Sequence, residues 1–203
     1  MAPLRKGVFG GAFNPPHVAH LIVAHVVGEA MSLDQVLFVP SSVHPFKNET
    51  GASPAQRAAM AELAVAGDRR LEVDRIEVRR GGLSYTVDTL AELREREPGT
   101  EWHLILGQDN LPELPQWKEA QRLPELATIV VMTRGGGQAA PGLPFDGHAK
   151  LVPVPGLDVS STTVRERVAA GRSIRYWVPA GVEAFIHARG LYRREVDENP
   201  GGA

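Results

Sequence analysis

Short apolar runs alternate with amphipathic segments along most of the chain, and this alternation limits the fold more than any other feature. Runs typical of strands occupy residues 4–9, 36–39, 71–78, 102–106, 128–132 and 150–154. Helical patterns lie between or after them, at residues 17–31, 54–66, 86–96, 162–170 and 179–188. This spacing predicts βαβ units, and therefore an α/β, Rossmann-like, doubly wound and mostly parallel sheet with helices on both faces. We also expect a small helical part near the C-terminal end.

The length and composition favour one domain. The chain has 203 residues, enough to bury a sizeable core, and no Cys. Thiolate metal sites, disulfides and a cysteine nucleophile are therefore excluded. We assign residues 1–193 to a single domain, residues 134–147 to a Gly/Pro-rich surface loop and residues 194–203 to a disordered tail.

Charge and hydropathy restrict the partners. The formal net charge is −2, which argues against binding nucleic acid through a broad basic surface. The sequence contains neither an apolar run long enough to span a membrane nor an apolar signal-peptide core after Met1 to Lys6. We expect a cytoplasmic protein with small-molecule partners, without a nucleic-acid or membrane partner; a homo-oligomer is compatible with the sequence.

A glycine-rich turn follows the first predicted strand. Gly10 and Gly11 allow close approach of a ligand to the backbone, and Asn14 begins a rigid turn before the first predicted helix. His17 and His20 are three residues apart, so they share one face of the first helical turn. Free N–H groups and the positive end of the helix dipole make this position a natural anion site.

A second polar cluster begins a late predicted helix. Ser160, Thr162 and Arg165 could clamp a polyphosphate through hydroxyls and a guanidinium. The cluster also has a structural interpretation, because Ser and Thr are common N-caps and Thr163 and Glu166 have capping-box spacing.

Two of these motifs together, GGAFNPPHVAH and SSTTVRER, resemble those of the nucleotidylyltransferase superfamily, which carry an H-x-G-H-type motif and a downstream S-x-T-x-x-R. The segments SYTVDTL, LGQDN with Trp117-Lys118, and FIHARGLY are similar to the bacterial nicotinate-mononucleotide adenylyltransferases. The resemblance spans residues 6–192. The chain departs from the family at Ala19, where Gly is usual, at Asn14, often Asp, and at Phe46, where the family tends to have His.

The resemblance implies transfer of AMP from ATP to nicotinate mononucleotide, giving deamido-NAD and pyrophosphate, in NAD biosynthesis. It implies catalytic roles for His17, His20 and Arg165. It implies ATP binding by Gly10, Gly11, Ala12, Phe13, Lys47, Arg134, Ser160 and Thr162. Mg²⁺ is expected to enter bound to ATP, without a metal site of protein side chains.

For nicotinate mononucleotide, the resemblance implies binding by Tyr85, Thr86, Gly107, Asp109 and Trp117. An indole face can stack on a pyridine ring, and donors at Tyr85 and Thr86 can bind a carboxylate. Tyr85 and Trp117 could instead be core or rim aromatics, and Asp109 could be a helix cap.

Two other functions are compatible with the residues. One is a sister adenylyltransferase acting on nicotinamide mononucleotide or phosphopantetheine. The other is a nucleotide-binding sensor without turnover, which Ala19 and Phe46 favour and His17, His20 and Arg165 oppose.

Overall fold

The computed structural model describes residues 2–43, 51–134, 145 and 149–194. Within them, six strands form one sheet, and every strand pairs in parallel with its neighbours. The strands are β1 (Arg5–Gly11), β2 (Gln35–Pro40), β3 (Leu71–Val73), β4 (Glu101–Gly107), β5 (Thr128–Arg134) and β6 (Ala149–Val154). Their order, β3-β2-β1-β4-β5-β6, is that of the Rossmann fold. The predicted fold class is confirmed.

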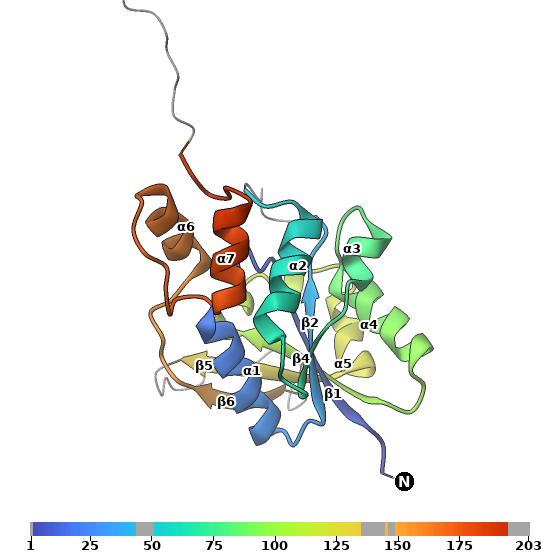
Figure 1. Cartoon of the computed structure of the whole chain (residues 1–203). Helices are drawn as coiled ribbons and strands as arrows, with labels where there is room; N and C mark the ends of the chain where they lie inside the picture. Colours follow the sequence, from blue (N-terminus) through green and yellow to red (C-terminus); the bar gives the residue numbers. More distant parts are fainter. Residues whose placement is uncertain (1, 44–50, 135–144, 146–148, 195–203) are drawn as a thin grey trace, which may run out of the picture.

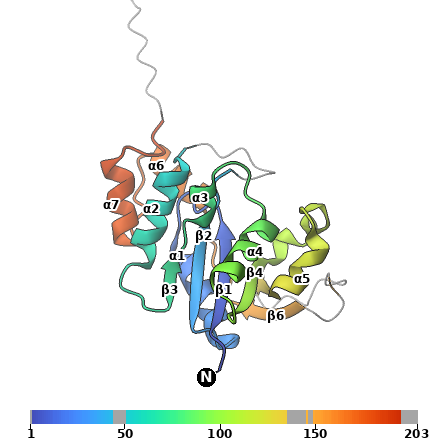
Figure 2. The ribbon, with the colours of Figure 1, turned by 90° about the vertical axis from the view of Figure 1, so that its right-hand side faces the viewer.

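Helices cover both faces of this sheet. The longer ones are α1 (Val18–Ala30), α2 (Pro54–Val65), α4 (Thr86–Arg96), α6 (Ser161–Ala169) and α7 (Ala180–Ala188). Two short helices, α3 (Ile76–Arg80) and α5 (Leu123–Leu126), pack against the same buried cluster as α4, and α3 also contacts α2. Helices α4 and α5 lie on the side of the molecule away from α6 and α7 (Figures 1 and 2). Single 3₁₀ turns, η1 (Gln108–Asn110), η2 (Leu114–Gln116) and η3 (Ala120–Arg122), connect β4 to α5.

Strand side chains alternate between two buried clusters. Val8 and Leu104 face the cluster that includes α4, whereas Phe9 and Ile105 face the cluster that includes α1. The four inner strands β1, β2, β4 and β5 thus bury residues on both faces, which explains their apolar runs in the sequence, whereas the edge strands β3 and β6 keep exposed residues. A third cluster joins α2, α6 and α7. Of these helices, α6 and α7 form the predicted helical part near the C-terminal end (Figure 1).

One predicted element is partly wrong. Residues 71–78 were expected to form a single strand, but β3 ends at Val73 and α3 begins at Ile76. The Asp74 carboxylate accepts a hydrogen bond from the Ile76 backbone N–H at 2.9 Å and so favours a turn. Ile76 then packs into the same cluster as α4, so its apolar side chain supports a helix contact instead of a strand.

The two central strands separate toward their carboxyl ends. Pairing between β1 and β4 ends at Val8 with Leu104, three residues before either strand ends. Over the same stretch, β1 stays paired with β2 as far as Gly11, and β4 stays paired with β5 as far as Gly107. Because strand order reverses between β1 and β4, this opening is where the fold provides a ligand site.

Candidate active site

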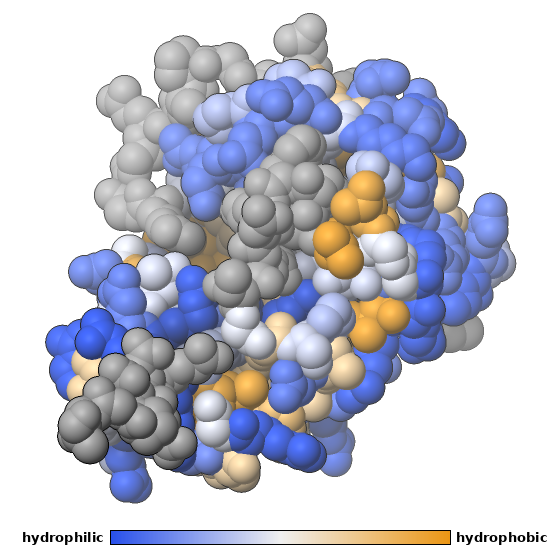
Figure 3. Space-filling view, turned by 90° about the horizontal axis from the view of Figure 1, so that it is seen from above, coloured by the Kyte–Doolittle hydropathy of each residue, from blue (hydrophilic) through white to orange (hydrophobic). Residues whose placement is uncertain are grey.

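A cavity of about 190 Å³ lies in this opening. Its walls come from the ends of β1 and β4, the residues after β2, the start of α4 and the turn after η2. The cavity brings together seven of the predicted site residues: Gly10, Gly11, Ala12, Tyr85, Thr86, Gly107 and Trp117. Figure 3 shows the molecule from above; on the face that it presents, small hydrophobic patches lie among hydrophilic residues.

The glycine-rich turn borders the cavity with its backbone. A Cβ at Gly10 would meet no atom within 4 Å, so a side chain there would extend into open space beside the cavity. At Gly11, a Cβ would lie 3.3 Å from the ring of Phe13, which leaves little room for any side chain. Phe13 is buried and has a φ of 48°, so it turns the chain sharply, and its role in ATP binding stays a prediction.

The two histidines form a stacked pair at the start of α1. Their ring centroids are 3.7 Å apart, and the backbone N–H of His17 donates to Nδ1 of His20 at 3.1 Å. A neutral His20 therefore carries its proton on Nε2, which remains a hydrogen-bond donor. The rings of Phe13 and Phe9 pack against His20, with centroids at 5.1 and 6.0 Å, and hold the imidazole in place.

The backbone at the start of α1 differs from the expectation of free N–H groups. The Val18 N–H donates to the carbonyl of Trp177 at 3.0 Å, and the His20 N–H donates to the carbonyl of His17 at 3.0 Å. With the His17 N–H also engaged, these three donors are not available to an anion. The start of α1 therefore offers an anion fewer backbone donors than the sequence suggested.

Arg165 lies against the turn that precedes the histidines. Its Nη1 donates to the carbonyl of Asn14 at 2.8 Å, and its Nη2 donates to Oγ1 of Thr162 at 3.1 Å. The Asn14 side-chain oxygen also accepts a hydrogen bond from the Tyr192 hydroxyl at 2.7 Å. Burial raises the pKa of Tyr192, so its hydroxyl stays protonated and can keep donating. Residues about 150 positions apart are thereby fixed beside the histidine pair.

Ser160 acts as the N-cap of α6. Its Oγ accepts a hydrogen bond from the Thr163 N–H at 3.1 Å, and the Thr163–Glu166 capping box suggested by the spacing does not form the cap. The neighbouring Ser161 hydroxyl donates to the carbonyl of Pro15 at 2.7 Å. The start of α6 is therefore tied to the glycine-rich segment, and the role of Ser160 in ATP binding stays a prediction.

The other side of the cavity is aromatic. Tyr85 is the N-cap residue of α4, Thr86 is its first residue, and Trp117 directly follows η2. Tyr85 and Trp117 also pack against the core cluster of α4, so they are rim aromatics as well as lining residues. Lys118, which the sequence analysis named beside Trp117 without giving it a role, has its Nζ 4.9 Å from the Tyr85 ring centroid and forms an ion pair with Asp88 at 2.8 Å.

Asp109 is exposed and does not line the cavity. The neighbouring Asn110 does line it, and its side-chain oxygen accepts a hydrogen bond from the Gly107 N–H at 3.2 Å. Asn110 therefore fills the capping role considered for Asp109. A Cβ at Gly107 would collide with Asp109 Oδ1, so another residue at this position would require the exposed Asp109 side chain to move.

Two predicted ATP contacts have no described side chain. Lys47 lies outside the described residues, and Arg134 is described only as the last residue of β5. Their roles remain predictions.

Arg57 is a buried site residue that the sequence reasoning missed. This α2 side chain is 1% exposed, and its Nη1 donates to the carbonyl of Ala12 at 2.7 Å. Its Nη2 donates to the carbonyl of Ser42 at 2.8 Å. It therefore joins the glycine-rich turn to the end of β2. In the sequence it lies in a regular helical pattern, where an arginine is usually exposed.

Glu77 is a second buried charged residue that was missed, and it lines the cavity from α3. Burial raises the pKa of its carboxyl, although hydrogen bonds from Thr89 and Ser84 and the positive charges of Arg80 and Arg57 oppose the shift. Its only sequence signal is an acidic residue among apolar ones before SYTVDTL.

The described part of the chain shows neither a metal-ion site of His, Asp and Glu side chains nor a membrane-spanning helix. Among the described residues, no group of three or more His, Asp or Glu side chains could hold a metal ion. The helices of that same part of the chain include none that is long and apolar enough to cross a membrane.

Known proteins resemble this chain over nearly its whole length. The family model for cytidylyltransferase-like proteins matches residues 8–167. A protein of Thermus thermophilus is 45% identical over 193 residues, covering 94% of this chain and 100% of its own length. One of Roseiflexus castenholzii is 44% identical over 200 residues, covering 93% and 98%. Both are named "Probable nicotinate-nucleotide adenylyltransferase".

A solved structure shares the fold. It is Plasmodium falciparum nicotinic acid mononucleotide adenylyltransferase complexed with NaAD, with a TM-score of 0.75, 17% identity, and coverage of 93% of this chain and 97% of that one. With the parallel sheet and its open switch point, the family model and the two relatives define the class as a nucleotidyltransferase. The chain belongs to the cytidylyltransferase-like family and, within it, to the nicotinate-nucleotide adenylyltransferases.

Proposed function

We propose that this protein transfers AMP from ATP to nicotinate mononucleotide and releases deamido-NAD and pyrophosphate, as a step of NAD biosynthesis. The observation that carries the proposal is the cavity where β1 and β4 separate. The glycine-rich turn borders one side of it and leads to the histidine pair at the start of α1, and the aromatic start of α4 borders the other side. His17, His20 and Arg165 do not line the cavity themselves. Two nucleotides that meet end to end need two such adjoining half-sites.

On the nucleotide side, we assign phosphate binding to His17, His20 and Arg165. In a neutral His20 the proton lies on Nε2, because Nδ1 accepts the His17 backbone N–H, and this N–H is the donor that we assign to a phosphate oxygen. The Arg165 guanidinium is fixed by Asn14 and Thr162, so its geometry is set before ATP binds. Such preorganised donors can stabilise charge that develops on the transferring phosphorus and on the leaving pyrophosphate.

On the acceptor side, we assign nicotinate binding to Tyr85, Thr86 and Trp117. The first N–H groups of the eleven-residue helix α4 lie at a cavity wall, and a helix N-terminus favours an anionic group such as a carboxylate. The indole of Trp117 offers a face on which a pyridine ring can stack. These features support the acid over the neutral amide as substrate.

The reaction places modest demands on acid–base chemistry. An oxygen of the mononucleotide phosphate attacks the α-phosphorus of ATP, the new P–O bond forms, and the bond to the bridging oxygen of pyrophosphate breaks. The attacking phosphate is already an anion near neutral pH, so the protein mainly positions the reactants and stabilises charge. We propose that Mg²⁺ enters with ATP as part of the substrate. All groups assigned here come from one chain, and we propose the cytoplasm as the compartment.

A product assay tests the proposal. Purified protein with ATP and Mg²⁺ receives nicotinate mononucleotide, nicotinamide mononucleotide or phosphopantetheine, and products are separated by chromatography. Deamido-NAD with equimolar pyrophosphate, formed fastest from the first acceptor, would support it. Preference for another acceptor would overturn the assignment of Tyr85, Thr86 and Trp117. Bound ATP without any product would favour a sensor.

A further inference from the structure

Glu77 is a buried carboxyl group at the wall of the proposed acceptor half-site. It belongs to the short helix α3, is 8% exposed and lines the cavity together with Ser84, Tyr85, Thr86 and Thr89. A buried carboxyl group is costly unless hydrogen bonds satisfy it, so its presence beside a ligand cavity requires an explanation.

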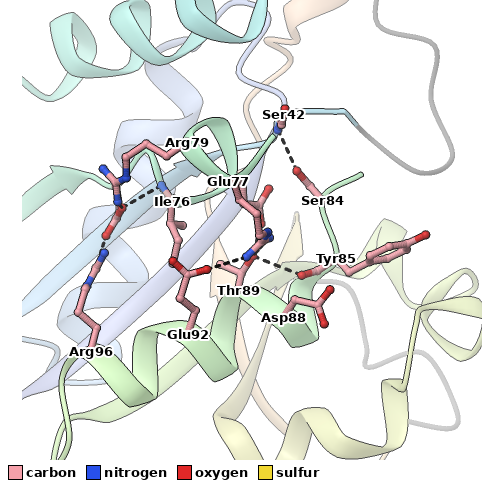
Figure 4. Close-up of polar contacts among 12 residues, drawn as sticks. Ser42, Ile76, Glu77, Arg79, Ser84, Tyr85, Asp88, Thr89, Glu92 and Arg96 are labelled. Atoms are coloured by element: carbon pink, nitrogen blue, oxygen red, sulfur yellow. Dashed lines mark hydrogen bonds and ion pairs between the residues drawn. The ribbon is translucent and has the colours of Figure 1, made fainter. Parts of the chain in front are cut away.

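The hydrogen bonds of Glu77 explain why this carboxyl group is buried beside the cavity. The Thr89 hydroxyl donates to Glu77 Oε1 at 2.7 Å, and Thr89 Oγ1 itself accepts from Arg80 Nη2 at 2.8 Å. The Ser84 side chain is a second hydrogen-bond partner of the carboxyl group. Figure 4 shows these residues near the start of α4, with Tyr85 directed away from them.

These two partners lie on either side of the segment assigned to the nicotinate. Ser84 directly precedes Tyr85, and Thr89 lies four residues after it, in the first turn and a half of α4. One carboxyl group thus holds both ends of the stretch containing Tyr85 and Thr86. Ser84 extends the connection, because its Oγ accepts from the Ser42 N–H at 2.9 Å.

Ser42 in turn connects this network to the nucleotide side. Its carbonyl accepts from Arg57, which also donates to the carbonyl of Ala12 in the glycine-rich turn. The Ser42 backbone is therefore linked to two buried side chains of opposite charge, to Arg57 directly and to Glu77 through Ser84. Each of these two side chains holds one half-site. Arg57 is the charge closer to ATP in this arrangement, and Glu77 is the charge closer to the acceptor.

We propose that Glu77 is a positioning residue for the acceptor substrate, which fixes the Ser84–Thr86 wall through the hydroxyls of Ser84 and Thr89 and thereby sets the affinity for nicotinate mononucleotide. The proposal rests on the proposed function. It differs from a purely structural role, which would lower stability without distinguishing between the two substrates.

The test is steady-state kinetics on a matched set of variants. Thr89→Val removes the donor to Glu77 with little change of shape, and Thr89→Ser restores a hydroxyl. Glu77→Gln keeps the size of the side chain but can no longer accept from both hydroxyls. The control is Glu92→Gln, because Glu92 pairs with the same Arg80 at 3.1 Å but does not line the cavity. Pyrophosphate release is measured while each substrate is varied in turn, and thermal unfolding is recorded for every variant.

In Thr89→Val and Glu77→Gln we expect KM for nicotinate mononucleotide to rise about tenfold, while KM for ATP changes less than about twofold. Thr89→Ser and Glu92→Gln should stay within about twofold of the wild type for both substrates. An unchanged acceptor KM, an equal rise for both substrates, or failure of Thr89→Ser to restore the acceptor KM would overturn the positioning role.

Failure of the proposed function gives a different result. If the wild-type protein itself forms no deamido-NAD, both the function and the positioning role are refuted. If the wild type is active and the variants show no acceptor-specific effect, only the positioning role is refuted. Should Glu77→Gln not fold, the comparison of Thr89→Val with Thr89→Ser decides the question.

Discussion

His20 has two separate tasks, and a pair of substitutions can separate them. Its Nδ1 accepts the His17 N–H at 3.1 Å and so caps α1, whereas Nε2 is the donor assigned to ATP. In His20→Asn, the side-chain oxygen can take the place of Nδ1, but nothing replaces Nε2–H. In His20→Ala, both groups are lost. The two variants therefore share the loss of the proposed phosphate contact and differ in the cap.

The contacts set the expected magnitudes. Either variant loses one preorganised donor, so turnover should fall by roughly 10²–10³-fold, or about 3–4 kcal/mol of barrier. Either variant also loses the packing of the imidazole on Phe13, with centroids 5.1 Å apart, worth about 0.5–1.5 kcal/mol of stability. Only His20→Ala loses the cap, which should cost roughly a further 1 kcal/mol.

Two measurements check this reasoning. Pyrophosphate release at saturating ATP and nicotinate mononucleotide gives turnover, and urea denaturation gives the free energy of unfolding. Equal losses of turnover with unequal losses of stability are expected. The assignment of Nε2 would be wrong if His20→Asn kept turnover within about threefold of the wild type. It would also fail if turnover in the two variants simply followed their stabilities.

Three further predictions concern charged and aromatic groups. Arg57→Met leaves the carbonyls of Ala12 and Ser42 without this donor. Urea denaturation should show that the free energy of unfolding falls by roughly 2–5 kcal/mol. As a control, Arg75→Met breaks an exposed ion pair with Glu62 and should lower the free energy of unfolding by no more than about 1 kcal/mol. Trp117→Ala should raise KM for nicotinate mononucleotide by roughly tenfold with little change for ATP, and an equal rise for both would contradict its placement beside the acceptor. Burial raises the pKa of Asp74, but its ion pairs with Arg96 and Arg79 outweigh burial and hold that pKa below 3.8. The stabilisation from Asp74 should therefore be complete at a pH above 3.8 and lost as the pH falls through the lower pKa of the folded state. Denaturation at a series of pH values should show that Asp74→Asn destabilises the protein at about pH 7 and much less at acidic pH, well below 3.8.

Much of the fold could be predicted because the inner strands of the sheet are buried on both faces. Residues 102–106 and 128–132 are continuous apolar runs, and the structure extends them only to β4 (Glu101–Gly107) and β5 (Thr128–Arg134). The prediction was wrong in the second half of residues 71–78, where Asp74 turns the chain into α3. That helix is five residues long, which is too short to show a helical period in the sequence.

The glycine-rich turn and the residues after the first strand could be located in advance for a related reason. Ligands bind at the carboxyl ends of parallel strands. A glycine at such an end lets a ligand approach the backbone closely, and this property follows from the residue type alone, so it can be recognised in the sequence. The helical pattern located the start of α4, the family resemblance gave Tyr85 and Thr86 a binding role, and the cavity includes both residues.

Tertiary contacts decided the rest. The sequence by itself determined the order of elements, the helix with His17 and His20 at its start, and the apolar faces that form the sheet. It could not show that Arg57 and Glu77 are buried and linked through Ser42, because their partners lie 7 to 45 residues away along the chain. Nor could it show that Trp177 occupies the Val18 N–H, a donor that the helix start alone would leave free. A side chain's neighbours across the fold determine whether its charge is solvated or satisfied by hydrogen bonds, and only the folded chain fixes those neighbours.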